Sequence, residues 1–209
     1  MRSALLKLLL MISIGFSVQA GTKTWNNASG GNWGAASNWV ENAVPGAGDT
    51  VYITLDGNYT VTYNANYTFP SVIYLGGSSG IQTLYNPGNV FGVTGTITVN
   101  TNGVLWGIAG TYSATSVINN GTIRLTNGSF TFGAPIINND SIYVAGTTIT
   151  LSGSLTNNDS IYVATGTLRL SGGGASVGGD IVVASGSTLQ LNTGTFTYDA
   201  SSTITGSGN

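Results

Sequence analysis

The residues that could do chemistry in this chain are few, and they recur at a regular spacing. Asp140, Asp159 and Asp180 each accompany a turn that precedes an apolar triplet. The first two are followed three residues later by Tyr143 and Tyr162. If these positions repeat in space, the three aspartates form a column that could hold a calcium ion together with neighbouring Asn oxygens. The two tyrosines would form a second column that could stack on sugar rings.

Both columns also have a structural explanation, and we favour it. Asp suits an Asn-Asp turn, and the chain contains neither a Gly-rich nonapeptide calcium repeat nor an EF-hand loop. A pair of aromatic side chains on neighbouring strands stabilises a sheet by about 0.2–1 kcal/mol. We therefore expect no cofactor, with calcium at the aspartates as the alternative. Tyr143 and Tyr162 are the only ligand-binding candidates.

The composition excludes several classes of catalyst. The chain has no histidine and no cysteine, so a Ser-His triad, a Cys nucleophile and His-based proton transfer are all excluded. Polysaccharide hydrolases and lyases need clustered carboxylates, or calcium with a basic residue at the reacting carbon. Arg124 and Arg169 fall on different strands of different coils, which weakens that alternative. We expect no enzymatic activity.

A repeat of about 20 residues must position these side chains. The segment 119–125 (NNGTIRL) returns at 138–144 (NNDSIYV) and at 157–163 (NNDSIYV), and loosely at 178–183 (GGDIVV). A second apolar stripe follows inside each unit, at 130–132, 149–151, 168–170 and 189–191. A unit this short cannot bury its own apolar face and must stack on its neighbours.

The triplets alternate between buried and exposed positions, as in β-strands. The inward positions are predicted for eight residues, namely Ile123, Leu125, Ile142, Val144, Ile161, Val163, Ile181 and Val183. The outward position of the same strands carries Arg124, Tyr143, Tyr162 and Val182. Asn-Gly, Asn-Asp and Gly-Gly supply the turns, and the repeated Asn pairs should form amide ladders along the axis. The pattern predicts an all-β fold, a right-handed parallel β-helix (β-solenoid).

The start of the chain is typical of a secretory signal peptide. Arg2 and Lys7 precede an apolar run from Leu8 to Phe16, and the segment closes on Ala20, after which cleavage is expected. A membrane anchor is the alternative, but the run is too short to span a bilayer. Cleavage would leave three basic residues against seven acidic ones, so a phosphate-backbone ligand is not expected. The mature chain should lack a transmembrane segment.

The residues after the leader are rich in aromatic side chains. Residues 25–33 (WNNASGGNW), 36–39 (ASNW) and 44–53 (VPGAGDTVYI) contain three Trp residues and a Pro-Gly turn that ends in Asp49. We expect Trp25, Trp33 and Trp39 to cover the end of the apolar column as a cap, rather than to form a ligand platform. Asp49 should satisfy backbone amides in its turn.

This segment resembles the start of large bacterial secreted β-helix proteins, including autotransporter-like and haemagglutinin-like adhesin passengers. The resemblance is close over about the first thirty residues after the leader, and elsewhere extends only to the repeat style. It implies a secreted or cell-surface protein that is frequently adhesive and frequently without enzymatic activity. Its partners would be a host or cell-surface receptor or a polysaccharide. No translocator barrel or sorting signal accompanies the segment in this sequence.

The expected organisation has four parts. They are a signal peptide at 1–20, an N-terminal capping segment at 21–50, irregular first coils at 51–94, and regular coils at 95–209. The last coil has no covering segment after residue 205, so we expect it to be continued by further coils or to self-associate. The predicted function is a secreted or surface-exposed, non-catalytic structural or adhesive β-helix protein. The alternative is a β-helix that binds or processes carbohydrate.

Overall fold

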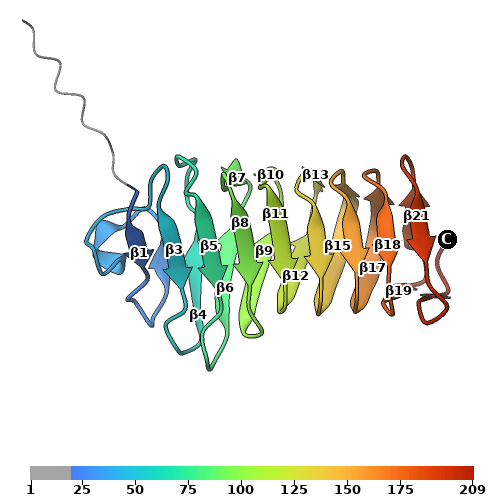
Figure 1. Cartoon of the computed structure of the whole chain (residues 1–209), viewed down its shortest axis with the longest axis horizontal. Helices are drawn as coiled ribbons and strands as arrows, with labels where there is room; N and C mark the ends of the chain where they lie inside the picture. Colours follow the sequence, from blue (N-terminus) through green and yellow to red (C-terminus); the bar gives the residue numbers. More distant parts are fainter. Residues whose placement is uncertain (1–19) are drawn as a thin grey trace, which may run out of the picture.

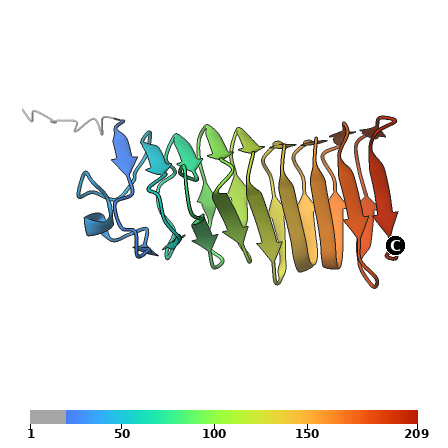
Figure 2. The ribbon, with the colours of Figure 1, turned by 90° about the horizontal axis from the view of Figure 1, so that it is seen from below.

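The chain winds into a stack of coils built almost wholly of short parallel strands (Figure 1). The computed structural model describes residues 20–209, so the predicted signal peptide lies outside the described residues except for Ala20. Seen from below, the strands lie side by side along the whole stack (Figure 2). Among the described residues the only helical element is the 3-10 turn η1 (Ala36–Asn38), and no helix is long and apolar enough to cross a membrane. The parallel β-solenoid predicted from the repeat is confirmed.

One sheet forms the first face of the solenoid. Its strands, in spatial order, are β1 (Thr22–Thr24), β3 (Thr50–Ile53), β5 (Val72–Leu75), β8 (Thr96–Val99), β11 (Ser116–Asn119), β14 (Ile136–Asn138), β16 (Leu155–Asn157), β18 (Gly174–Ser176) and β21 (Phe196–Tyr198). Neighbours in space are never neighbours in sequence, because each coil passes through other strands before it returns to this face.

The remaining strands form two further faces that share long strands. The second face comprises β2 (Gly31–Asn32), β4 (Tyr59–Thr62), β6 (Gln82–Asn86), β9 (Gly103–Gly107), β12 (Thr122–Thr126), the first parts of β15 (Ser141–Leu151) and β17 (Ser160–Leu170), β19 (Asp180–Val183) and β22 (Thr203–Gly206). The third face comprises β7 (Phe91–Gly92), β10 (Thr111–Ser113), β13 (Ser129–Phe132), the last parts of β15 and β17, and β20 (Thr188–Leu191).

Register keeps equivalent residues in columns along the axis. Ile123, Ile142 and Ile161 pair in line and continue to Ile181. All eight residues predicted to point inward are at most 4% exposed. The columns also run back into the less regular part of the chain, where Val51, Ile73 and Ile97 pair in the same way on the first face. The irregularity of residues 51–94 lies in the turns and on the third face, which has no strand before the two-residue β7.

A polar ladder runs inside the apolar core. The Asn119 side-chain amide donates to Asn138 Oδ1 at 2.7 Å, and the Asn138 amide donates to Asn157 Oδ1 at 2.8 Å. The Asn157 amide continues to Ser176 Oγ at 3.2 Å. All three Asn residues are fully buried. The amides of Asn138 and Asn157 also donate to the backbone carbonyls of Asp140 and Asp159 in the turns that follow them, and the Asn119 amide donates to the carbonyl of Ser141 in the next coil. The inner ladder therefore fixes the turn between the first and second faces.

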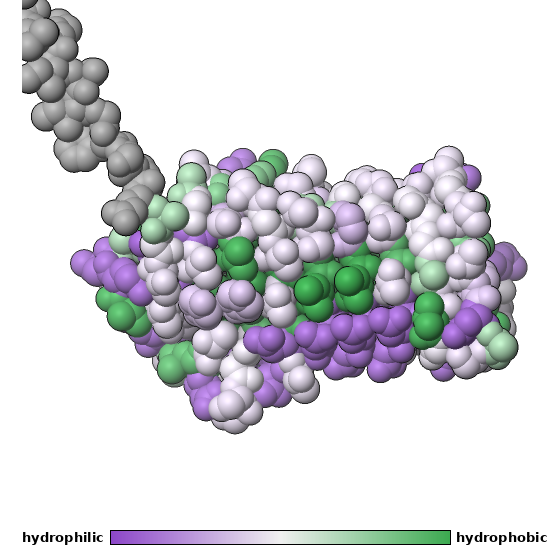
Figure 3. Space-filling view, viewed as in Figure 1, coloured by the Kyte–Doolittle hydropathy of each residue, from purple (hydrophilic) through white to green (hydrophobic). Residues whose placement is uncertain are grey.

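A second ladder lies next to the first but outside it. Asn139 Nδ2 donates to Asn120 Oδ1 at 2.8 Å, and Asn158 Nδ2 donates to Asn139 Oδ1 at 2.7 Å. In Figure 3 a hydrophilic band runs along the solenoid beside an apolar patch on the first face. Exposed Ile137 and half-buried Ile118 pair directly on that face. The amide ladders expected from the repeated Asn pairs are thus present both inside and outside.

The N-terminal Trp residues form part of the core. Trp25, Trp33 and Trp39 are at most 1% exposed. Trp39 lies with its ring centroid 5.0 Å from each of the other two, in edge-to-face geometry, and Trp33 contacts Tyr63 of the next coil. Asp49 is also buried and accepts hydrogen bonds from the amides of Gly21 and Gly46. The rings close the apolar column, as the cap interpretation predicts, and are not available as a ligand platform.

The inner ladder yields a stability prediction. Asn138→Ala removes one hydrogen-bond acceptor and one donor from the buried inner ladder. Each buried group left without a partner costs about 1–3 kcal/mol. Its sequence neighbour Asn139 occupies the exposed ladder, so Asn139→Ala should change stability by about 0.5 kcal/mol or less. Urea unfolding followed by circular dichroism measures both values. Equal losses of unfolding free energy in the two variants would show that burial is not the reason the inner ladder stabilises the fold.

Candidate functional site

The aspartates stack only in part. Asp140 and Asp159 occupy equivalent turn positions, since Ser141 pairs with Ser160 directly after them. Ser160, however, pairs with Asp180, so Gly179 takes the place expected for Asp180. The cause is one extra residue in that turn: Gly178 adopts a φ of 72°, a conformation that suits glycine. The predicted column of three aspartates is wrong, and Asp180 instead accepts a hydrogen bond from Thr203 Oγ1 at 2.6 Å.

The remaining pair behaves as two like charges. Desolvation, and then the neighbouring Asp159 carboxylate, raise the pKa of Asp140 above its ordinary value. A carboxyl whose pKa is raised by folding binds protons more tightly in the folded state, so the pair lowers stability as the pH rises through that range. Within residues 20–209, no group of three or more Asp or Glu residues is arranged to hold a metal ion.

The tyrosines belong to a longer column on the second face. Register places five outward side chains in line, namely Tyr85, Trp106, Arg124, Tyr143 and Tyr162. We call these five residues the aromatic column. Ring centroids lie 4.7 Å apart for the first pair and 5.9 Å apart for the last. Tyr162 is 43% exposed, Arg124 is exposed, and the other three are half-buried.

Arg124 links the two aromatic pairs. Its guanidinium carbon lies 4.9 Å from the Trp106 ring centroid and 5.4 Å from that of Tyr143. Cation–π contacts at exposed sites contribute about 0.5–1 kcal/mol each. Within the described residues the guanidinium forms no ion pair, since the single ion pair there joins Lys23 and Asp49. The column thus combines four rings with one cation that no carboxylate neutralises.

Sequence reasoning found Tyr143, Tyr162 and Arg124 but missed Tyr85 and Trp106. The signal for Trp106 is present: residues 102–107 (NGVLWG) repeat the pattern of 120–125 (NGTIRL). The structure pairs Val104 with Thr122 and Trp106 with Arg124 accordingly. The turn before Gly103 is longer than those of later coils, which disrupts the period and conceals the match.

A groove borders the aromatic column where the second face turns into the third. It has a volume of about 400 Å³ and is lined by Asn127, Gly128, Ala145, Gly146, Thr147, Thr165 and Gly166. We call it the corner groove. A register irregularity in β15 and β17 opens it, because Ala145 pairs with Thr165 rather than with Ala164. Neither the aspartates nor the tyrosines are among its lining residues, and the column reaches it only through Ala145, two residues after Tyr143.

The second arginine lies apart from this region. Arg169 is on the third face, in line with Thr150 and Gln190, and its Nε donates to Gln190 Oε1 at 3.0 Å. The expectation that the two arginines fall on different strands of different coils is confirmed. They cannot act together on one reacting carbon.

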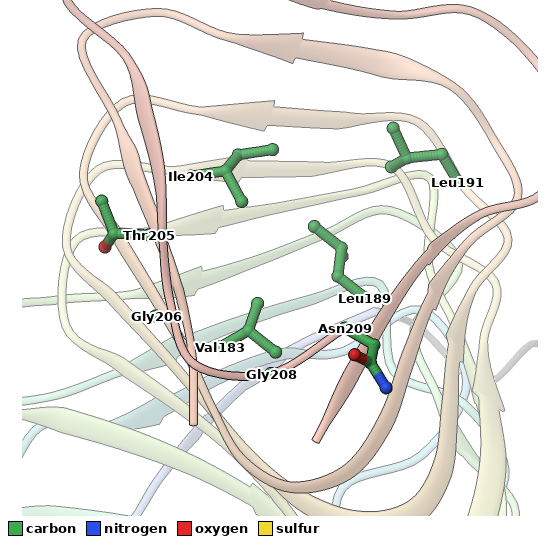
Figure 4. Close-up of a pocket in the computed structure, with 8 residues that line it drawn as sticks. All are labelled: Val183, Leu189, Leu191, Ile204, Thr205, Gly206, Gly208 and Asn209. Atoms are coloured by element: carbon green, nitrogen blue, oxygen red, sulfur yellow. The ribbon is translucent and has the colours of Figure 1, made fainter. Parts of the chain in front are cut away.

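A separate pocket lies at the C-terminal end of the stack (Figure 4). It has a volume of about 350 Å³ and is lined by Val183, Leu189, Leu191, Ile204, Thr205, Gly206, Gly208 and Asn209. Leu191 is 52% and Ile204 46% exposed, although their equivalents in earlier coils are buried. The pocket lies in the apolar interior of the last described coil.

No protein-family model, no curated protein and no solved structure matches this chain.

The aspartate pair yields a prediction about calcium. If Asp140 and Asp159 are only turn residues, added calcium should leave the melting temperature of the protein unchanged. A site occupied at 100 times its dissociation constant would add about 2.7 kcal/mol to stability, an effect that thermal unfolding with and without calcium detects easily. A calcium-dependent rise that Asp159→Ala abolishes would contradict the turn explanation.

Proposed function

We propose that this protein is a secreted or surface-exposed β-solenoid with a non-catalytic, adhesive or structural role. The observation that carries the proposal is the regularity of its outer surface. The exposed Asn ladder repeats one kind of contact from coil to coil, and the aromatic column places outward side chains in register along the same axis. A repeated linear surface suits attachment to an extended partner, because many weak contacts act together.

Two features of the sequence agree with this role. The leader-like segment at 1–20 fits export, and the Trp-rich start resembles the N-terminal part of bacterial secreted adhesin passengers. Carboxylates that lie in turns, and arginines on separate faces, suit binding better than catalysis. The partner we propose is a receptor or polysaccharide on a cell surface, with no nucleic acid.

The proposal is tested by measuring export, binding to cells, and the release of sugar from those cells. The protein, expressed with its own leader in a bacterium, should be recovered outside the cytoplasm with Gly21 as its first residue. The labelled protein should be retained on intact bacterial or host cells, and soluble sugar should not be released from them. Released sugar would contradict a non-catalytic role, and failure to bind any of these cells would contradict an adhesive one. Intact leader on cytoplasmic protein would contradict secretion.

We also propose that the last described coil associates with a second copy of the chain. Open strand edges and exposed apolar residues favour edge-to-edge pairing, and Tyr198 at 38% exposure adds to Leu191 and Ile204. Sedimentation of the protein at high concentration should show species larger than a monomer, and Leu191→Asp should restore the monomer.

The matched control for this variant lies on the flank of the solenoid. Ile137 is similarly exposed, at 41%, but sits on the first face away from the open end. Ile137→Asp should leave the association intact. A wild-type protein that stays monomeric, or equal effects of the two variants, would contradict docking through the last coil.

A further inference from the structure

We propose that the aromatic column and the corner groove together bind a linear, uncharged polysaccharide that runs parallel to the solenoid axis. This inference rests on the proposed adhesive function and names the chemical class of its partner. It concerns Tyr85, Trp106, Arg124, Tyr143 and Tyr162, together with the groove that borders them.

The spacing of the column suits a polymer of rings. Parallel strands repeat about every 4.8 Å, which is close to the length of one pyranose unit in an extended polysaccharide. A sugar ring has an apolar face of C–H groups and a rim of hydroxyls. The apolar face can pack against the solvent-facing side of an aromatic ring, and Tyr162 offers the most exposed ring of the column. Five outward side chains in line therefore offer successive contacts to successive sugar units.

Hydrogen-bonding groups flank the rings on one side. Thr122 and Ser141 precede Arg124 and Tyr143 by two residues on the same strands, so they face the same way. Their hydroxyls lie 3.1 Å apart and already form a pair. On the other side, the corner groove begins at Ala145, two residues after Tyr143, and presents Thr147 and Thr165. The hydroxyl rim of a bound chain would thus have polar groups along both edges.

Two of the column's side chains are held in place before any ligand arrives. Trp106 Nε1 donates to Thr126 Oγ1 of the next coil at 2.7 Å, which fixes the indole plane. Arg124 is held between that indole and the Tyr143 ring, yet donates no hydrogen bond to another described residue. A guanidinium carries five donors, so it can bind the hydroxyls of a sugar at little ordering cost.

The charges favour a neutral polymer over an acidic one. The column contains a single cation, whereas Asp140 and Asp159 lie directly before the two strands that carry Tyr143 and Tyr162. Burial, and then the neighbouring Asp159 carboxylate, already raise the pKa of Asp140. The whole chain is also net negative, at −2. An acidic polysaccharide would bring further negative charge to this side of the solenoid.

Affinity electrophoresis of the purified protein tests the inference. The probes are hydroxyethyl cellulose and galactomannan as neutral polymers, and alginate as an acidic one. At least one neutral polymer should retard the protein, and alginate should not. The double variant Tyr143→Ala/Tyr162→Ala should weaken that binding by roughly tenfold or more, the change that 1.4 kcal/mol produces. Arg124→Gln, which keeps a polar side chain of similar reach, should also weaken it.

The first face supplies a matched control. Tyr52 and Tyr74 form a stacked pair with centroids 5.1 Å apart, outward and in register on β3 and β5. Tyr52→Ala/Tyr74→Ala should leave binding unchanged, and the melting temperatures of all variants show whether each one folds. Equal losses in the two double variants would mean nonspecific aromatic adhesion and would overturn the site, as would retardation by alginate alone.

The experiments distinguish failure of the polysaccharide site from failure of the adhesive function. If cells retain the protein and its Tyr143→Ala/Tyr162→Ala variant equally, and no neutral polymer retards either, the adhesive function stands and the polysaccharide site is wrong. If the protein binds neither cells nor polymers, both proposals fail.

Discussion

Coil-to-coil register is the constraint on which the rest of this structure depends. Each strand satisfies its backbone by pairing with the equivalent strand of the coils on either side, so a residue is always placed against its counterpart one coil away. A side chain that packs poorly against an identical side chain in the next coil therefore destabilises the fold at each coil where it occurs. Apolar columns, the two Asn ladders and the aromatic column all follow from this one condition. The Asp140–Asp159 pair shows its cost, since register also forces like charges together.

The same constraint explains how much of the structure could be predicted. Inward columns repeat the side-chain alternation of a strand, and a period of about 20 residues aligns them. The eight predicted core residues and the Asn ladders were therefore accessible from the sequence. The turns were not, because a turn can gain a residue without changing the strands. Gly178 adds one residue and moves Asp180 out of its expected column, and the longer turn before Gly103 concealed Trp106.

Burial separates aromatic residues that the sequence could not tell apart. Trp25, Trp33 and Trp39 are enclosed by Tyr59, Tyr63 and one another, and they close the apolar column at the first coil of the described residues. Trp106 sits at an outward position in mid-stack, where its neighbours above and below are Arg124 and Tyr85. A Trp at the end of a solenoid completes the core, whereas a Trp on its flank needs another explanation.

Stacking between rungs is one such explanation, and it leaves the solvent-facing sides of the rings for binding. Each ring–ring or cation–π contact stabilises the sheet by about 1 kcal/mol or less, yet the same contacts hold the rings in fixed planes. The column lies on an outward face where Arg124 and Tyr162 are exposed, so one sugar unit would touch one rung and be held weakly. A polymer that touches several rungs gains through effective concentration, because its second and later contacts are intramolecular. A flat column in a solenoid is therefore suited to long chains and poorly suited to free sugars, which is the selectivity that attachment to an extended surface requires.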